Sequence, residues 1–201
     1  RKAYRAVRRN QGGAGVDGKS ISETGRHLRQ HWPALAEKLK AGDYVPSAVR
    51  GIRIPKPTGG ERLLGIPTVQ DRLIQQAVGQ CLSVRFEPTF SEHSYGFRPG
   101  RSAHDAVRAA QGYLRAGKTW VVDMDISAFF DHVNHDILMH RVGQQERDPR
   151  VLRLIGRYLR AAMDMDGVRQ ARREGTPQGG PLSPLLANIY LHHVLDVWVE
   201  D

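Results

Sequence analysis

Apolar residues recur at helical spacing through the first part of the chain. In residues 26–40, Leu28, Leu35 and Leu39 fall on one face, which predicts a helix with one buried side. Residues 70–86 show a longer stripe of the same period and predict a second helix. The apolar members of that stripe are Leu73, Ile74, Ala77, Val78, Cys81 and Leu82.

Other segments have the pattern of strands. Residues 49–55 and 61–66 read as two strands, and the turn through Thr58-Gly59-Gly60 predicts that they form a hairpin. Residues 119–126 are rich in β-branched residues and predict a further strand, and residues 168–172 predict a short one.

Polar capping residues predict where other helices begin. Ser102 and Asp105 form a variant capping box, and Asn134 can cap a short helix. Asp148 stands before Pro149, an order that suits the first turn of a helix. Since helices and strands mix without regular βαβ alternation, the sequence favours an α+β fold. The predicted helices are 103–116, 135–142, 149–162 and 182–199.

Charge is unevenly distributed along the 201 residues, of which 40% are hydrophobic, enough for one domain or two small lobes. The net charge is +9. Residues 1–72 contain 15 Lys/Arg and 6 Asp/Glu, whereas residues 73–201 contain 15 of each. A polyanionic partner such as nucleic acid explains this asymmetry, and improved solubility is the alternative explanation.

The presence of a single cysteine indicates the kind of cellular compartment. Cys81 cannot form an internal disulfide, so we expect a reducing, cytoplasmic location of bacterial or organellar type. Its place on the apolar stripe predicts a buried core thiol. No apolar run approaches the roughly 20 residues of a membrane span, so no membrane partner is expected. Histidines at 132–140 and 192–193 have no accompanying cysteine, and a zinc site is not favoured.

The segment 121–131 carries the sharpest candidate chemistry. On a strand, Asp123 and Asp125 share a face, and carboxylates at the end of a buried strand are costly without a compensating positive charge. A divalent cation such as Mg²⁺ supplies that charge and favours oxygen ligands. The alternative is an edge strand with solvated acids, followed by a helix cap.

Residues 175–190 form a second block, a Gly/Pro-rich turn that leads into an apolar helix. Its glycines allow close approach of a ligand, although an ordinary loop and helix start has the same composition. Together the two blocks resemble the reverse transcriptases encoded by group II introns, with Asp125 and Phe130 as motif A and Pro177-Gln178-Gly179 as motif B. Three more blocks stand in the family's order, at residues 10–18 (N-terminal loop), 54–68 (fingers hairpin) and 90–104.

The resemblance implies a truncated right-hand polymerase architecture. Residues 1–110 would be a basic, fingers-like region, and residues 111–201 would be a partial palm with motifs A and B. The family's motif C, a Tyr-X-Asp-Asp hairpin, should lie shortly beyond motif B, but the sequence contains no adjacent Asp-Asp pair. We expect the family's thumb, RNA-binding and endonuclease regions to lie outside these 201 residues as well. We therefore expect a fragment that does not polymerise by itself.

The resemblance further implies a metal site. In the intact enzyme, two Mg²⁺ ions held by the motif A and motif C aspartates catalyse nucleotidyl transfer. Asp125 matches the motif A ligand, and Ile126 would add its backbone carbonyl. Asp123 is assigned a structural or supporting role.

Nucleotide contacts follow from the same resemblance. Phe130 would abut C2′ of the incoming sugar and exclude a ribose hydroxyl. Gln178 would contact the incoming nucleotide and the templating pair, and Gly179 would let the backbone approach that pair. Lys56 and Arg62 would clamp the triphosphate from the fingers turn.

Three arginines are candidates for contact with nucleic acid. Arg53 is expected to touch the template. Arg98 and Arg101 lie beside the aromatic residues of the 95–98 segment, a combination that can stack on bases and hold phosphates. Aromatic packing under a loop is the alternative. The loop at 10–18 would fold over the template strand or be flexible.

The implied function is RNA-directed DNA polymerisation from a DNA primer and dNTP, on group II intron RNA or another RNA template. The parent protein would also aid intron splicing and mobility. One alternative is a non-catalytic RNA-binding (maturase) module. Another is a related reverse transcriptase with a different genomic role, such as one linked to adaptive immunity. The sheet edge left open without motif C predicts self-association.

Overall fold

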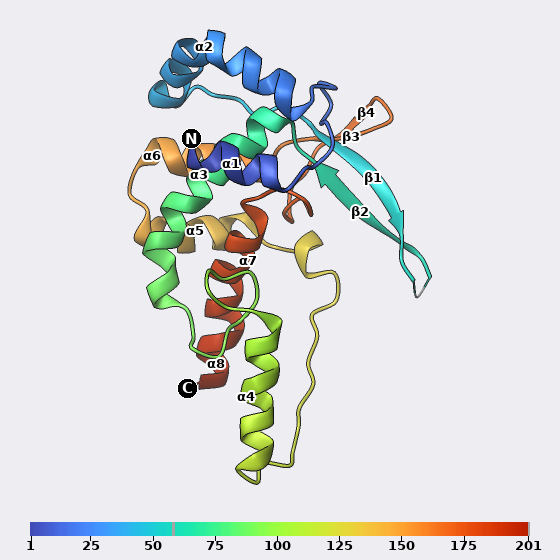
Figure 1. Ribbon diagram of the computed structural model, residues 1–201, viewed down its shortest axis with the longest axis vertical. Coiled ribbons are helices and arrows are strands. Elements are labelled where there is room, and N and C mark those ends of the chain that lie inside the picture. Colours follow the sequence, from blue (N-terminus) through green and yellow to red (C-terminus); the bar gives the residue numbers. More distant parts are fainter. Residues whose placement is uncertain (58, 201) are drawn as a thin grey trace.

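In the computed structural model, which describes residues 1–57 and 59–200, the strands form one sheet in the order β2-β1-β3-β4 (Figure 1). Strands β1 (Val49–Pro55) and β2 (Glu61–Ile66) are the predicted antiparallel hairpin, with the predicted bounds. Strand β3 (Met163–Met165) adds to β1 in parallel, and β4 (Val168–Gln170) follows it antiparallel. The sheet therefore joins segments more than 100 residues apart, since Val49 pairs with Met163.

The hairpin extends away from the helices, as Figure 1 shows. Near its tip, the Lys56 amide donates to the Gly60 carbonyl at 2.9 Å, which closes the turn. Gly59 and Gly60 both adopt positive φ, as the predicted turn requires. Thr58, the remaining residue of that turn, lies outside the described residues.

Helices make up most of the rest of the molecule, and most of their starting residues were predictable. The Ser102–Asp105 capping box, the Asn134 cap and the Asp148 cap all form as expected. The helices are α1 (Lys2–Arg9), α2 (Ile21–Ala41), α3 (Val69–Phe86), α4 (Ala103–Arg115), α5 (His135–Gln145), α6 (Pro149–Leu159), α7 (Ser183–Leu191) and α8 (Val197–Glu200), with a π-helical turn (His192–Asp196) joining the last two.

Two clusters of buried residues hold the helices together. The main core, between α3, α5, α6 and α7, is centred on Leu138, Ile155 and Leu186. A second cluster lies between α2, α3 and α6 and contains Leu28 and Ile74. Helix α6 ends at Leu159, before the predicted residue 162, because the chain turns there into the sheet.

The predicted strand at residues 119–126 is wrong. This segment is extended but irregular and runs from the foot of α4 back toward the core (Figure 1). Trp120, Val121 and Val122 are 95%, 79% and 81% exposed. A strand needs a neighbouring backbone to pair with, and within the described part of the chain no strand pairs with this segment.

One further expectation, the burial of Cys81, needs correction. Cys81 is exposed rather than a core thiol, because α3 turns its neighbour Leu82 into the main core instead. Asp164 lies on β3 and is half-buried, whereas Asp166 occupies the β3–β4 turn, at positive φ. None of the helices described is long and apolar enough to cross a membrane.

Candidate nucleotide and nucleic-acid site

The exit of motif A and the entry of motif B are joined by backbone hydrogen bonds. The Thr176 amide donates to the Phe130 carbonyl at 2.7 Å, and the Gly175 amide donates to the Val133 carbonyl at 2.8 Å. These residues are more than 40 positions apart in sequence. The fold thus places the Phe130 segment directly beside the loop that carries Gln178.

A buried histidine fixes this junction. His135, at the start of α5, lies with its Nε2 at 2.7 Å from the Gly175 carbonyl oxygen. Gly175 has φ +77°, and a Cβ there would come within 2.8 Å of the Phe130 carbonyl oxygen, so glycine is required. The sequence pointed to His135 only as one of several nearby histidines, and no local pattern indicated this long-range contact.

Motif B also contacts the base of the hairpin. The Gly65 amide of β2 donates to the Gln178 carbonyl at 2.7 Å. Gly179 has φ +123°, and a Cβ on it would lie 2.5 Å from the Gly65 carbonyl oxygen. Gly179 therefore lets the motif B backbone lie close to β2, and its approach to a base pair stays a prediction. The Gln178 side chain is half-buried, and its contact with a nucleotide stays a prediction.

Hydroxyl groups set the shape of the motif B loop. The Thr176 hydroxyl donates to the Ser183 oxygen at 2.9 Å, and the Ser183 hydroxyl donates to the Pro177 carbonyl at 2.8 Å. Both hydroxyl residues are buried. The start of α7 and strand β2 thus both hold the motif B loop in place through hydrogen bonds.

The hairpin separates its cations onto two faces. Arg62 pairs with Ile54 in the strand register, and Lys56 lies two residues beyond Ile54, so Lys56 and Arg62 share a face. Arg53 lies on the other face, where it forms an exposed ion pair with Glu61 at 3.3 Å. Lys56 and Arg62 are both exposed, as a triphosphate clamp requires, and that role stays a prediction.

Phe130 and Phe129 have different surroundings. Phe129 packs against the main core, and its ring centroid lies 6.0 Å from that of Tyr190. Phe130 is half-buried, and its ring meets Phe129 edge-on at 5.4 Å. Asp125 and Ile126 are exposed in the irregular segment that precedes them. Their predicted metal-binding roles stay predictions.

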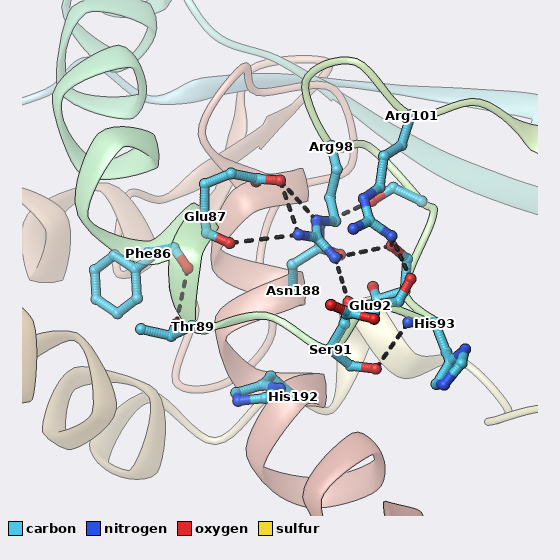
Figure 2. A network of polar contacts seen from close by, with 12 residues as sticks. Phe86, Glu87, Thr89, Ser91, Glu92, His93, Arg98, Arg101, Asn188 and His192 are labelled. Carbon is cyan, nitrogen blue, oxygen red and sulfur yellow. Dashed lines mark hydrogen bonds and ion pairs between the residues drawn. The ribbon is translucent and has the colours of Figure 1, made fainter. Parts of the chain in front are cut away.

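Arg98 requires a correction. Its side chain is only 4% exposed and forms an ion pair with Glu87 at 2.8 Å. The same guanidinium donates to the Ser91 and Glu87 carbonyls, as Figure 2 shows. It also donates to the Ser94 carbonyl and lies 5.4 Å from the Phe90 ring centroid. Arg98 therefore holds the 87–98 loop together and is not available to nucleic acid.

Arg101 stays a candidate for nucleic-acid contact. Its guanidinium lies 5.5 Å from the Tyr95 ring centroid and donates to the Ser94 carbonyl at 3.3 Å and to the Glu92 carbonyl. Nearby Phe97 is 77% exposed at φ +55°, while Asn188 of α7 donates to the Gly96 carbonyl at 2.8 Å. The two aromatic side chains of this segment therefore have different surroundings, since Tyr95 packs on Arg101 and Phe97 is exposed to solvent.

A buried polar cluster at the start of α3 was not predicted from the sequence. Asp71, 1% exposed, accepts hydrogen bonds from the hydroxyls of Thr68, Tyr44 and Tyr158 at 2.7, 2.7 and 3.2 Å. Burial raises the pKa of the Asp71 carboxyl above its ordinary value, and the opposing hydrogen bonds from Thr68 and Tyr44 offset only part of that rise. The cluster connects the start of α3, just after β2, to the segment before β1 and to α6.

The N-terminal loop is also anchored. Arg72, the neighbour of Asp71, donates to the Gly12 and Gly13 carbonyls at 3.3 and 2.6 Å. A Cβ on Gly15 would come within 2.6 Å of the Thr68 amide nitrogen. The loop at 10–18 therefore packs on the start of α3, and its contact with a template stays a prediction.

Comparison with known proteins decides the family. The sequence profile of the family described as Reverse transcriptase (RNA-dependent DNA polymerase) matches residues 54–201, more than half of the chain. The chain belongs to the reverse transcriptase family. The mixed helix and sheet structure fits the fingers and palm of that family, so the predicted α+β class is confirmed.

Similar proteins point to the group II intron type of reverse transcriptase. The chain is 40% identical over 161 residues to the Group II intron-encoded protein LtrA of Lactococcus lactis subsp. cremoris, covering 80% of this chain and 27% of LtrA. It is 38% identical over 182 residues to Protein YkfC of Escherichia coli (strain K12), covering 89% of this chain and 48% of YkfC. The chain thus spans about half the length of one relative and about a quarter of the other.

A solved structure agrees with this placement. A chain of a partial Cas6-RT-Cas1–Cas2 complex matches 99% of this reverse transcriptase chain with a TM-score of 0.62 and 27% identity, over 33% of its own length. The motif order drawn from the sequence therefore corresponds to a known three-dimensional arrangement.

Reverse transcriptases generally use divalent metal ions. In the part of the chain that the structure describes, no group of three or more His, Cys, Asp or Glu side chains is placed to hold one. The Asp125 carboxylate and the Ile126 carbonyl cannot by themselves hold two Mg²⁺ ions, because Mg²⁺ gives up its hydration reluctantly. The donor set of the described residues does not fit the two-ion site.

Proposed function

We propose that this chain is the fingers and partial palm of an RNA-directed DNA polymerase of the group II intron type, which copies RNA into DNA. One observation carries the proposal. Backbone hydrogen bonds join the Phe130 segment, the Gln178 loop and the base of the hairpin at Gly65. These are the segments that motif resemblance assigns to the sugar, the base and the triphosphate of one incoming nucleotide.

The chain's own residues divide the work of nucleotide binding. Lys56 and Arg62 grip the triphosphate from one face of the hairpin, and Phe130 bounds the sugar at C2′. Gln178 and Gly179 contact the nascent base pair. Arg53, on the other hairpin face, and Arg101 contact the nucleic acid. All of these groups bind or orient, which lowers the entropic cost of bringing the reactants together.

The proposal includes two Mg²⁺ ions in the intact enzyme, with Asp125 as one ligand. Further carboxylates would have to come from outside residues 1–201. We further propose an RNA template, a DNA primer and dNTP as partners, a role for the longer protein in intron splicing, and a cytoplasmic location.

Primer extension by the full-length protein on an RNA template tests the proposal. Lys56→Ala and Arg62→Ala should each raise the KM for dNTP about tenfold or more, with little change in affinity for primer–template, because both cations would bind the triphosphate. Arg53→Ala is the matched control on the opposite hairpin face and should weaken primer–template binding instead. If Lys56→Ala and Arg62→Ala lowered the affinity for primer–template without changing the KM for dNTP, the proposed triphosphate clamp would be wrong.

A second candidate function is RNA binding without catalysis. The excess charge of residues 1–72 favours it, since a basic surface alone binds RNA with steep salt dependence. The same assay separates the two functions. A full-length protein that binds RNA but extends no primer would support the non-catalytic maturase role.

A further inference from the structure

A groove of about 1120 Å³ opens between α1, α2, α3 and α6, and we call it the α1–α2 groove. These four helices gather in the upper part of Figure 1, with α1 crossing α3. None of the residues that line the groove belongs to the candidate nucleotide site. It is therefore a separate surface feature.

The floor of the groove is apolar. Leu28 and Ile74 belong to the second buried cluster, and Leu73 and Leu154 pack against it, so the groove exposes the outer side of that cluster. Trp32 stands at its edge and is 52% exposed. Covering such a floor with apolar side chains removes hydrocarbon surface from water, which favours binding.

The rim of the groove is positively charged. Arg5, Arg8 and Arg29 line it, and across residues 1–57 and 59–200 no carboxylate lies within ion-pair distance of these three guanidinium groups. The acidic residue of the lining, Asp148, is already paired with Arg150 at 2.6 Å. A complementary ligand therefore carries negative charge around an apolar centre.

The walls of the groove are held at both ends of α2. At its start, the Tyr4 hydroxyl of α1 donates to the Ile21 carbonyl at 3.3 Å, and Gly25 leaves room for the Tyr4 ring. At its end, Arg150 of α6 donates to the Lys40 carbonyl at 3.2 Å. The groove is thus preformed, which reduces the ordering cost of binding.

We propose that the α1–α2 groove binds an acidic amphipathic helix of a protein partner, with its apolar face on the floor and its carboxylates against the arginine rim. A helix with apolar residues at positions i, i+3, i+4 and i+7 presents such a face. Nucleic acid fits less well, because phosphates would use the rim but leave the apolar floor uncovered.

A helical peptide library tests the proposal on the full 201-residue chain. Each 16-residue member carries Leu, Ile, Phe or Trp at i, i+3, i+4 and i+7, and Glu, Asp or Ala elsewhere.

Ala77, an exposed residue of α3 in the groove lining, allows a filling variant, Ala77→Trp, that leaves the buried cluster intact. Arg29→Glu reverses one rim charge, and Arg115→Glu, on exposed α4, is the matched control.

We expect saturable binding of selected peptides to the wild-type chain. Ala77→Trp and Arg29→Glu should each weaken it at least about tenfold, and Arg115→Glu should leave it unchanged. A library with Lys in place of Glu and Asp should yield no binders.

The proposal is overturned if no acidic peptide is enriched, if Lys peptides bind equally, or if Ala77→Trp leaves the selected peptides bound. A 20-nucleotide RNA whose binding Ala77→Trp weakens as much as that of the peptides would show that the groove takes nucleic acid instead.

Discussion

At the scale of single residues, Phe130 offers the most specific consequence of the proposed site. Its ring is half-buried next to Phe129, and its carbonyl is bonded to the motif B loop. Phe130→Ala in the full-length protein should increase ribonucleotide incorporation at least about tenfold, because the wall proposed to face C2′ would be gone.

The ratio of kcat/KM for dNTP to that for rNTP measures this effect. Phe129→Leu is a suitable control, since Phe129 packs into the core. An unchanged ratio in Phe130→Ala would make Phe130 a packing residue only.

Residue roles were predictable from sequence only where local pattern decides them. Arg98 and Arg101 share the same aromatic surroundings in sequence, yet Arg98 is buried by its ion pair with Glu87, eleven residues earlier. That partner cannot be identified from local spacing. The prediction that Cys81 is buried was wrong for another reason. Cys81 stands at the edge of an apolar stripe, and the burial of that stripe depends on which helices pack against α3.

At the scale of elements, the Asp71 cluster should govern the stability of the sheet's attachment to the helices. Asp71→Ala would leave the hydroxyls of Thr68, Tyr44 and Tyr158 without their shared acceptor. Buried unsatisfied polar groups are expensive, so we expect a loss of about 3 kcal/mol in the free energy of unfolding.

Urea denaturation followed by circular dichroism would measure that loss. The control is Asp43→Ala, since Asp43 is an exposed carboxylate shortly before β1. Equal stability of the two variants would show that the cluster contributes little.

Elements with local signals were predicted well, and elements with non-local partners were not. The hairpin was predicted with its bounds because both strands and the turn are adjacent in sequence. Helix α2 begins five residues before the predicted start, at a Ser20–Glu23 capping box that was present in the sequence but not used. The prediction of a strand at residues 119–126 was wrong because a high content of β-branched residues does not provide a neighbouring strand to pair with.

At the scale of the whole molecule, the unpaired segment at 119–126 predicts self-association. Trp120, Val121 and Val122 form an exposed apolar stretch of extended backbone, which invites pairing with another copy. We expect dimers or larger species of the 201-residue chain at concentrations near 100 µM, within the range at which exposed hydrophobic surface drives association.

Sedimentation equilibrium would test this expectation. Val121→Lys should shift the chain toward monomer, because a charge blunts an exposed edge. Val84→Lys, at a 76% exposed position on α3, should not. A wild-type chain that stays monomeric would contradict the open-edge argument.

The central claim is that the hairpin, the Phe130 segment and the motif B loop surround one nucleotide. Photo-crosslinking in a complex of the full-length protein, RNA template and DNA primer tests it most directly. A dNTP with a photoreactive group on its γ-phosphate should label residues 56–62, and one with the group on its base should label residues 175–180. Labels concentrated elsewhere in residues 1–201, with these two segments unmodified, would contradict the account.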